Sequence, residues 1–170
     1  MTAAVGAGVN GTVVLVTNGT YSLISQVQVD FGVTVRGVGG FTNTVVDWNA
    51  LTRCFLLNHT NAVLDGLTIR GGYADRGGGV RAFGGTITNC LLTGNTATEM
   101  GGGAWLQGAR IVNCSLMTNL CAATGDFEAS GGGLYCELGS VAERCTVVSN
   151  SLSCDSWAAY GGGICAVDSL

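Results

Sequence analysis

The sequence predicts an all-β chain that winds as a right-handed parallel β-helix, and three observations support this fold class. The tripeptide Gly-Gly-Gly occurs four times, each time before an apolar residue, at 77–79, 101–103, 131–133 and 161–163. Three cysteines are each followed five positions later by an asparagine: Cys90 and Asn95, Cys114 and Asn119, Cys145 and Asn150. Short segments rich in Val, Ile, Leu and Thr fill the intervals, without a helical apolar period. Repeating units of this kind stack into solenoids.

The glycine triplets begin 24, 30 and 30 positions apart, which sets the length of one unit. We expect three short strands in each unit, and the clearest are Val13–Val16, Val33–Arg36, Thr44–Asp47, Cys54–Leu57, Leu67–Arg70, Gly79–Ala82, Leu91–Thr93 and Thr146–Ser149. Such a unit is shorter than a βαβ repeat of about 30 residues or a propeller blade of about 40. One unit therefore fits one coil of a β-helix, and the chain makes about six to seven coils at the usual interstrand spacing.

The pattern continues towards the N-terminus in weaker form. Gly66–Gly71 lies 24 positions before Cys90–Asn95, and Gly32–Gly37 lies 34 positions earlier again. This alignment predicts that Gly71 and Gly37 occupy the position of Asn95 in their own coils. Glycine and asparagine both tolerate a left-handed backbone, so we expect a tight αL turn at that position.

The same alignment has two consequences for side chains. It predicts that Gly66 continues the column of cysteines, and that Arg36 and Arg70 stack on one face near Asp47 and Asp65. The two longest insertions, 120–130 and 151–160, both lie between an asparagine and the next glycine triplet. We expect them to project from the same side of the helix in neighbouring coils.

We expect residues 1–170 to form one β-helix domain, with irregular coils over 1–76 and regular coils over 77–170. The chain has no basic segment followed by an apolar stretch at its start, and its last repeat is incomplete, so we expect a part of a longer protein. Open coils at both ends would expose unpaired strand edges. Head-to-tail stacking into filaments would cover these edges.

Composition limits the partners. Only 11% of the residues are charged, 47% are hydrophobic, and the net charge is -4 with no lysine. No basic run is present, so we expect neither nucleic acid as a partner nor binding to anionic membranes. No apolar stretch is long enough to span a bilayer. The single histidine, His59, and the absence of a Cys-x-x-Cys pair argue against a metal site, and no cofactor motif is present.

Stacked coils place equivalent residues above one another, so we expect two structural ladders. Buried thiols form one, with Cys90, Cys114 and Cys145. Amides that link coil to coil form the other, with Asn95, Asn119 and Asn150. Cys121 and Cys154 lie in the two long insertions, and in an oxidising compartment we expect a disulfide between them.

Two sets of residues are candidates for contact with a ligand. Trp105, Tyr135 and Arg81 share one repeat position that alternates outward from Ala104, so we expect them to line an exposed strip that could stack on a sugar. If the chain is an enzyme, paired carboxylates could perform acid–base chemistry on a sugar, and the candidates are Asp47 and Asp65 with Arg70. The alternative for the charged residues is a solvated surface of ion pairs.

The repeats resemble those of a known group. A glycine triplet before an aliphatic residue, followed by apolar-x-x-Asn at 92–95, 116–119 and 147–150, is similar to the repeats of chlamydial-type polymorphic outer membrane proteins. It resembles still more closely the bacterial right-handed β-helix proteins of the pectate-lyase-like superfamily. The resemblance covers about residues 11–170 and implies the fold. Its members include adhesins, passenger domains, lyases and glycosidases.

The resemblance favours a non-catalytic structural or adhesive module of a secreted or cell-surface protein, able to associate end to end. The alternative is a carbohydrate-active enzyme or a carbohydrate-binding β-helix, with a polysaccharide as the partner. Here leucine or valine replaces the aromatic residue of the family's Phe-x-x-Asn motif, and Gly-Gly-Gly replaces Gly-Gly-Ala.

Overall fold

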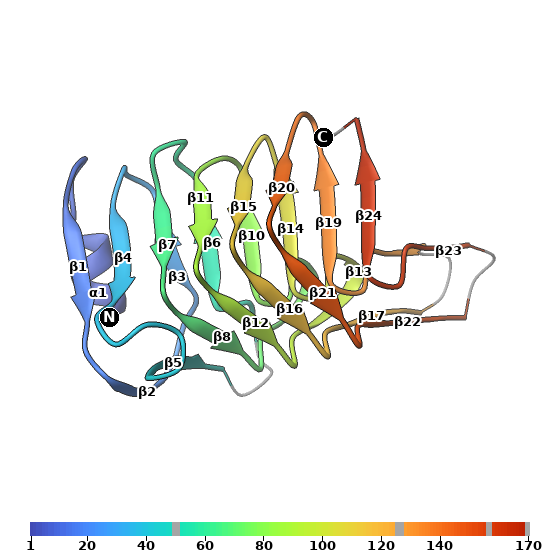
Figure 1. Cartoon of the computed structure of the whole chain (residues 1–170), viewed down its shortest axis with the longest axis horizontal. Helices are drawn as coiled ribbons and strands as arrows, with labels where there is room; N and C mark the ends of the chain where they lie inside the picture. The colour runs from blue at the N-terminus through green and yellow to red at the C-terminus, as the bar shows by residue number, and fades with distance from the viewer. Residues whose placement is uncertain (49–51, 125–127, 156–157, 169–170) are drawn as a thin grey trace.

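A computed structural model describes residues 1–48, 52–124, 128–155 and 158–168. Within these ranges the chain is a parallel β-helix of six coils, which follow one another along the long axis of the molecule (Figure 1). All the strand pairs are parallel, and each strand pairs with its equivalents in the neighbouring coils. The fold class predicted from the repeats is therefore confirmed.

Three six-stranded sheets form the wall of the helix, and each coil gives one strand to each sheet. Sheet A consists of β1 (Val13–Val16), β4 (Thr34–Gly37), β7 (Val63–Asp65), β11 (Thr86–Thr88), β15 (Arg110–Val112) and β20 (Val141–Glu143). Sheet B consists of β2 (Gly19–Ser22), β5 (Thr44–Asp47), β8 (Thr68–Arg70), β12 (Leu91–Thr93), β16 (Ser115–Met117) and β21 (Thr146–Val148). Sheet C consists of β3 (Val27–Val29), β6 (Phe55–Leu57), β10 (Val80–Ala82), β14 (Ala104–Gln107), β19 (Leu134–Glu137) and β24 (Ile164–Val167).

A fourth sheet begins at the third coil, which the expectation of three strands per coil did not include. Sheet D consists of β9 (Tyr73–Arg76), β13 (Thr96–Met100), β17 (Leu120–Ala123), β18 (Ala129–Ser130), β22 (Ser151–Cys154) and β23 (Ala159–Tyr160). The two long insertions pair with each other here, β17 with β22 and β18 with β23. They extend away from the coils on the same side, at the lower right of Figure 1, as their position in the repeat predicts.

Stacked aliphatic side chains fill the interior of the coils. In sheet C, Val80, Ala104 and Leu134 are opposite one another and fully buried. Sheet B contributes a second inward column with Ile69, Leu92 and Leu116, also fully buried. Burial of each such side chain contributes about 1.5–3 kcal/mol, so these columns supply the main driving force for the fold.

The register of the early coils differs from the prediction by one residue. Thr68 pairs with Leu91, so Leu67 is opposite Cys90 and Gly66 is not. By the same count Gly72, not Gly71, is equivalent to Asn95. The apolar residues Ile69 and Leu92 must both point inward, and a slip of one residue would turn one of them outward. Burial therefore sets the register, and the glycines do not.

The left-handed turn consequently lies one position before the asparagine. Its residues are Gly71, Gly94, Thr118 and Ser149, with φ of 70°, 61°, 54° and 55°. A second αL position precedes the cysteines, at Gly66, Asn89, Asn113 and Arg144. The asparagines of the ladder are free of this backbone strain, and their side chains have a different task.

The segment around Arg36 lies in a different sheet from the one predicted. Thr34, Val35 and Arg36 pair with Val63, Leu64 and Asp65 in sheet A, whereas Leu67–Arg70 leads into sheet B. The strand opposite β8 in the preceding coil is β5. The prediction that Arg36 and Arg70 share one repeat position is therefore wrong.

The glycine triplets bring the backbones of successive coils together at the entry to sheet C. The first glycine of each triplet has a left-handed backbone, with φ of 63° to 66° at Gly77, Gly101, Gly131 and Gly161. The middle glycine touches the neighbouring coil, because a Cβ at Gly102 would overlap the carbonyl oxygens of Gly132 and Leu120. No side chain fits between these coils, and this explains why glycine is used.

The two ends of the coil stack differ, although two open ends were expected. Helix α1 (Thr2–Gly6) lies against the first coils, and Val5, only 2% exposed, joins the core (Figure 1). In the sixth coil, by contrast, Ile164 is 45% exposed. It occupies the position in which Leu134 and Ala104 are fully buried. Helix α1 therefore covers part of the N-terminal end, and no helix packs on the sixth coil in the described residues.

Candidate functional site

The predicted catalytic residues do not come together as a pair of carboxylates. Asp65 ends β7 in sheet A, and Asp47 ends β5 in sheet B. Each carboxylate forms an ion pair with an arginine of an adjacent coil: Arg36 Nε lies 2.8 Å from Asp65 Oδ2, and Arg70 Nη2 lies 2.7 Å from Asp47 Oδ2. These contacts are cross-strand pairs that link one coil to the next.

The aromatic strip is present with the predicted register. Arg81, Trp105 and Tyr135 are opposite one another on successive strands of sheet C, and Cys165 continues the row. The strip is nevertheless not exposed, because Trp105 is only 2% and Tyr135 only 7% exposed. The expectation of an open aromatic platform is therefore wrong. Another aromatic residue that could stack on a sugar, Trp157, lies outside the described residues.

Arg81 packs against two aromatic rings that also contact each other. Its guanidinium carbon lies 4.8 Å from the centroid of the Phe83 ring and 4.9 Å from that of Trp105. The two rings meet edge to face with their centroids 5.2 Å apart. A cation over aromatic faces is attracted by about 0.5–2 kcal/mol, more when water is excluded. This cluster, Arg81 with Phe83 and Trp105, forms the centre of the candidate site.

Charged side chains from sheet D and from the segment before β6 surround this cluster. Asp75 of β9 lies 2.6 Å from Arg53 Nη2 and 3.7 Å from Arg81 Nη1. In the same sheet Arg76 Nε lies 2.8 Å from Glu99 Oε2. Sequence reasoning missed Arg53, Arg76 and Glu99, because it had not identified sheet D. The sequence does contain a signal for this charged group: the segments 73–76 and 96–100 occupy equivalent places in adjacent units, and both contain charged residues.

The pKa values at the site reflect burial and these partners. Burial lowers the pKa of Arg81, and the nearby guanidinium of Arg53 acts in the same direction. Burial alone would raise the pKa of Asp75, but the backbone amide of Arg76 and the charge of Arg53 outweigh it and lower the pKa. Burial, followed by the charge of Glu137, raises the pKa of Tyr135.

Two buried donors of the cluster have no hydrogen-bond partner in the described structure, namely Arg81 Nε and Trp105 Nε1. An unsatisfied buried donor costs about 1–3 kcal/mol. Each of these N–H groups can donate a hydrogen bond to an oxygen atom, for example of water, a hydroxyl or a carboxylate.

The three asparagines form the amide column that the repeats predict. Asn95 Nδ2 donates to Asn119 Oδ1 at 3.0 Å, and Asn119 Nδ2 donates to Asn150 Oδ1 at 2.9 Å. The same amides bind the backbone: Asn119 Nδ2 also donates to the carbonyl of Leu92 at 3.0 Å. Asn95 Oδ1 accepts from the amide of Gly72 at 3.0 Å. Each asparagine thus bonds to the coils on both sides of it, where such a coil is present.

The three cysteines form a second column at the turn from sheet A to sheet B. The amide of Cys90 donates to Cys114 Sγ at 3.3 Å, and the amide of Leu67 donates to Cys90 Sγ at 3.5 Å. Burial raises the pKa of Cys90 well above its usual value. The hydrogen bond from the Cys90 thiol lowers the pKa of Cys114. Cys145, in the last coil, is only half-buried.

The expected disulfide between Cys121 and Cys154 is not formed in the structure. Cys121 is opposite Leu152, whereas Cys154 is opposite Ala123, two residues further along. With strands about 4.8 Å apart and a rise of about 3.3 Å per residue, such diagonal neighbours are separated by roughly 8 Å. A disulfide spans about 4.4–6.8 Å between Cα atoms, so the register prevents the bond. Both side chains instead belong to the small apolar core of sheet D.

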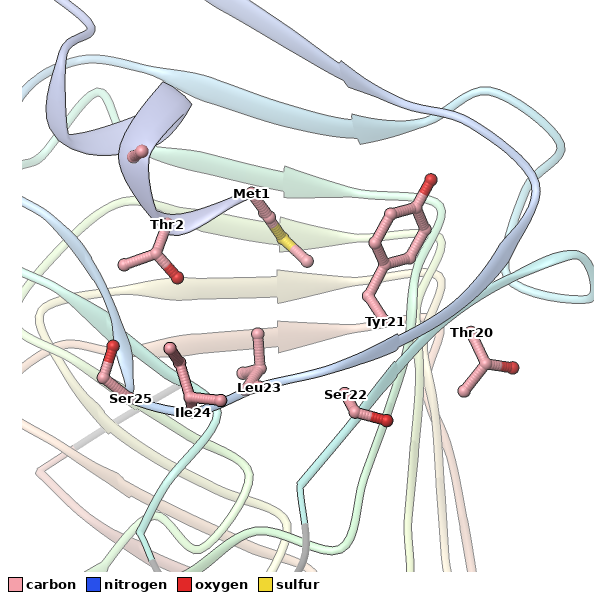
Figure 2. Close-up of a pocket in the computed structure, with 9 residues that line it drawn as sticks. Met1, Thr2, Thr20, Tyr21, Ser22, Leu23, Ile24 and Ser25 are labelled. Atoms are coloured by element: carbon pink, nitrogen blue, oxygen red, sulfur yellow. The ribbon is translucent and has the colours of Figure 1, made fainter.

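A hollow of about 770 Å³ lies at the N-terminal end, between helix α1 and the first coil. Met1, Tyr21 and Leu23 point towards one another across it (Figure 2). Its other lining residues are small or hydroxylated apart from Ile24, and it contains none of the predicted site residues. The hollow therefore lies beside helix α1 and is not part of the cluster around Arg81.

Within the described residues, none of the helices has the length and apolar character needed to cross a membrane. In the same part of the chain, no three His, Cys, Asp or Glu side chains gather closely enough to hold a metal ion.

Comparison of the chain with protein-family models, with curated proteins and with solved structures finds no match.

Proposed function

We propose that this chain is a non-catalytic structural and adhesive β-helix module of a secreted or cell-surface protein. The amide column from Asn95 through Asn119 to Asn150 is the observation that carries this proposal, because it joins successive coils by buried hydrogen bonds. Charged residues are used in the same way, as in the ion pair of Asp47 with Arg70. Side chains that a polysaccharide lyase would direct at a sugar here connect neighbouring coils.

Incubation with acidic polysaccharides tests the absence of catalysis. We expect the purified chain to release no product from polygalacturonate, alginate or hyaluronan, followed by the ultraviolet absorbance of unsaturated sugars and by an assay for reducing ends. Asp65→Asn and Arg36→Ala serve as matched variants, since they remove the two sides of one ion pair. Product formation that disappears in Asp65→Asn and persists in Arg36→Ala would overturn the proposal.

The uncovered sixth coil supports self-association as part of this function. Ile164, Val147 and Ala142 occupy core positions there and are partly exposed, and β20, β21 and β24 are the last strands of their sheets in the described residues. Because helix α1 covers the opposite end, association through like ends would give a closed pair rather than a filament. Light scattering should detect a concentration-dependent dimer that Ile164→Asp weakens and Ile24→Asp, at the covered end, does not. A strict monomer at high concentration would contradict this part.

Carbohydrate binding without turnover is a second candidate, and the two unsatisfied donors of the aromatic cluster favour it. A sugar hydroxyl or uronate carboxylate would satisfy Arg81 Nε and Trp105 Nε1. Titration calorimetry with the same polysaccharides should show binding that Trp105→Phe weakens, because phenylalanine keeps an aromatic ring but lacks the N–H. Trp48→Phe is the matched control, since its Nε1 is also buried without a partner but lies outside the cluster. Equal binding by both variants would exclude this site.

A further inference from the structure

The column of cysteines contains one opposed pair in which one of the two thiols is accessible to reagents. Val112 pairs with Glu143, and Ser115 pairs with Thr146, so Cys114 and Cys145 are opposite each other in the fifth and sixth coils. The amide of Thr146 donates to the carbonyl of Cys114 at 2.9 Å and holds the two turns together. Opposed residues of adjacent strands lie about 4.8 Å apart, within the Cα separation of about 4.4–6.8 Å that a disulfide spans.

The two side chains also have the same orientation. Cys114 Sγ donates to the carbonyl of Val112 at 3.3 Å and to that of Ile87 at 3.7 Å. Cys145 Sγ makes the equivalent contacts, with Glu143 at 3.3 Å and Ile111 at 3.6 Å. The two thiols therefore occupy equivalent positions in adjacent coils, one above the other along the helix axis.

Access distinguishes this pair from the pair above it. Cys90 is 1% and Cys114 is 2% exposed, whereas Cys145 is half-buried. A small disulfide compound can therefore reach Cys145 and cannot reach Cys90. We propose that Cys114 and Cys145 form a reversible disulfide that fastens the sixth coil to the fifth when a small disulfide oxidant is supplied.

The chemistry is two thiol–disulfide exchanges. The Cys145 thiolate attacks one sulfur of the oxidant, and the S–S bond of the oxidant breaks to release one thiolate. The Cys114 thiolate then attacks Cys145 Sγ and displaces the second thiolate. Two protons from the protein thiols pass to the released thiolates, so the dithiol is oxidised and the oxidant is reduced to two thiols. The hydrogen bond from Cys90 lowers the pKa of Cys114, which favours the second step.

Oxidised glutathione is a suitable probe, used on the full chain at pH 8.5. We expect the number of thiols titrated in denaturant to fall from the eight in the sequence to six, and to return to eight with dithiothreitol. Digestion and tandem mass spectrometry should locate the bond between Cys114 and Cys145. The oxidised chain should also melt at a higher temperature, because the link restricts the unfolded state.

Cys145→Ser should retain all its remaining thiols under the same treatment, and Cys165→Ser should still lose two. Cys165 is the matched control, since it is also a half-buried cysteine of the sixth coil but is opposite Tyr135. Retention of eight thiols, a bond mapped to Cys90 or Cys121, or loss of two thiols from Cys145→Ser would each overturn the proposal.

Discussion

Asn95 and Asn119 lie one coil apart and are joined twice, since Asn119 Oδ1 accepts from both the side-chain amide and the backbone amide of Asn95, at 3.0 and 3.1 Å. Both residues are fully buried. One oxygen therefore satisfies two donors of the preceding coil, and the same pattern recurs between Asn119 and Asn150. A defect in this column affects three coils at once.

Asn119→Ala should be among the most destabilising substitutions in the chain. It leaves the backbone amide of Asn95 without its partner and removes the side-chain donor to the carbonyl of Leu92. It also removes one of the two hydrogen bonds made by Asn95 Nδ2 and by Asn150 Oδ1, and each unsatisfied buried group costs about 1–3 kcal/mol. Urea denaturation should show a loss of about 3 kcal/mol or more in the free energy of unfolding. Asn150→Ala, at the half-buried end of the column, should lose less, and the exposed Asn61→Ala should change little. Equal losses at Asn119 and Asn61 would refute a structural role for the column.

Gly102→Ala and Gly162→Ala should differ sharply, although both change the middle glycine of a triplet. The new Cβ at Gly102 would meet the carbonyls of Gly132 and Leu120, whereas at Gly162 it meets nothing within 4 Å. The first substitution forces the fourth and fifth coils apart, so we expect a loss of several kcal/mol or failure to fold, about the upper range for single substitutions. The second should change the free energy of unfolding by less than about 0.5 kcal/mol. Circular dichroism during thermal unfolding distinguishes them.

Leu138→Gly should stabilise the protein. Leu138 has φ of 53° and is 59% exposed. It occupies the position that Gly108 has in the previous coil. A left-handed backbone costs a non-glycine residue about 1–2 kcal/mol. Glycine avoids this cost but loses about 0.5–1 kcal/mol of the gain, because its greater freedom in the unfolded chain must be given up on folding. The net gain in the free energy of unfolding should be about 0.5–1 kcal/mol. Leu138→Ala, which keeps the strain, is the control and should show no such gain.

The free energy of unfolding should fall in alkaline solution. Burial raises the pKa of Cys54 and of Cys136 to about 12 and that of Cys121 to about 11. In the unfolded chain these thiols lose their protons near pH 8.5, so the native state holds more protons above that pH. Stability is therefore constant below about pH 8 and falls as the pH rises towards 12, by up to about 1.4 kcal/mol per pH unit for each thiol.

Urea denaturation under reducing conditions at pH 8 and pH 10 measures this slope. Cys54→Ala should show a shallower decline than the unchanged chain, because one of the thiols whose pKa is raised to about 12 is absent. Cys165→Ala is the comparison, since Cys165 is less buried. A decline that is the same in both variants would assign the effect to other groups.

The sequence was sufficient to predict the coil stack, the amide column and the position shared by Arg81, Trp105 and Tyr135. These features depend on residues that recur at fixed intervals, so their spacing directly reports which positions are opposed. The register of Gly66 and Gly71 was harder to predict from the sequence. It depends on which of two adjacent residues points inward, and glycine, which has no side chain, carries no information on that point.

The burial of Trp105 could not be inferred from the repeats. The residues around Trp105 come from strands β9, β10 and β13 and from the segment after β10. They are Arg81, Phe83, Asp75, Arg76 and Glu99. Strands β9 and β13 belong to sheet D and have no recurring signature. Their alignment also contains an irregularity between Ala97 and Met100, which shifts the match by one residue. Alternation along β14 correctly places Trp105 on the outer side, but only the three-dimensional arrangement shows what covers that side.

The unit from Gly77 to Met100 forms one complete turn of the chain, and the next unit enters and leaves at equivalent points. Excision of these 24 residues would place Arg76 directly before Gly101 and bring Asn119 within reach of Gly72, where Asn95 now stands. Duplication of the same stretch would add an equivalent rung. Genes of this type can therefore change the length of their product in whole steps, by unequal recombination, without disturbing the joints between the remaining rungs.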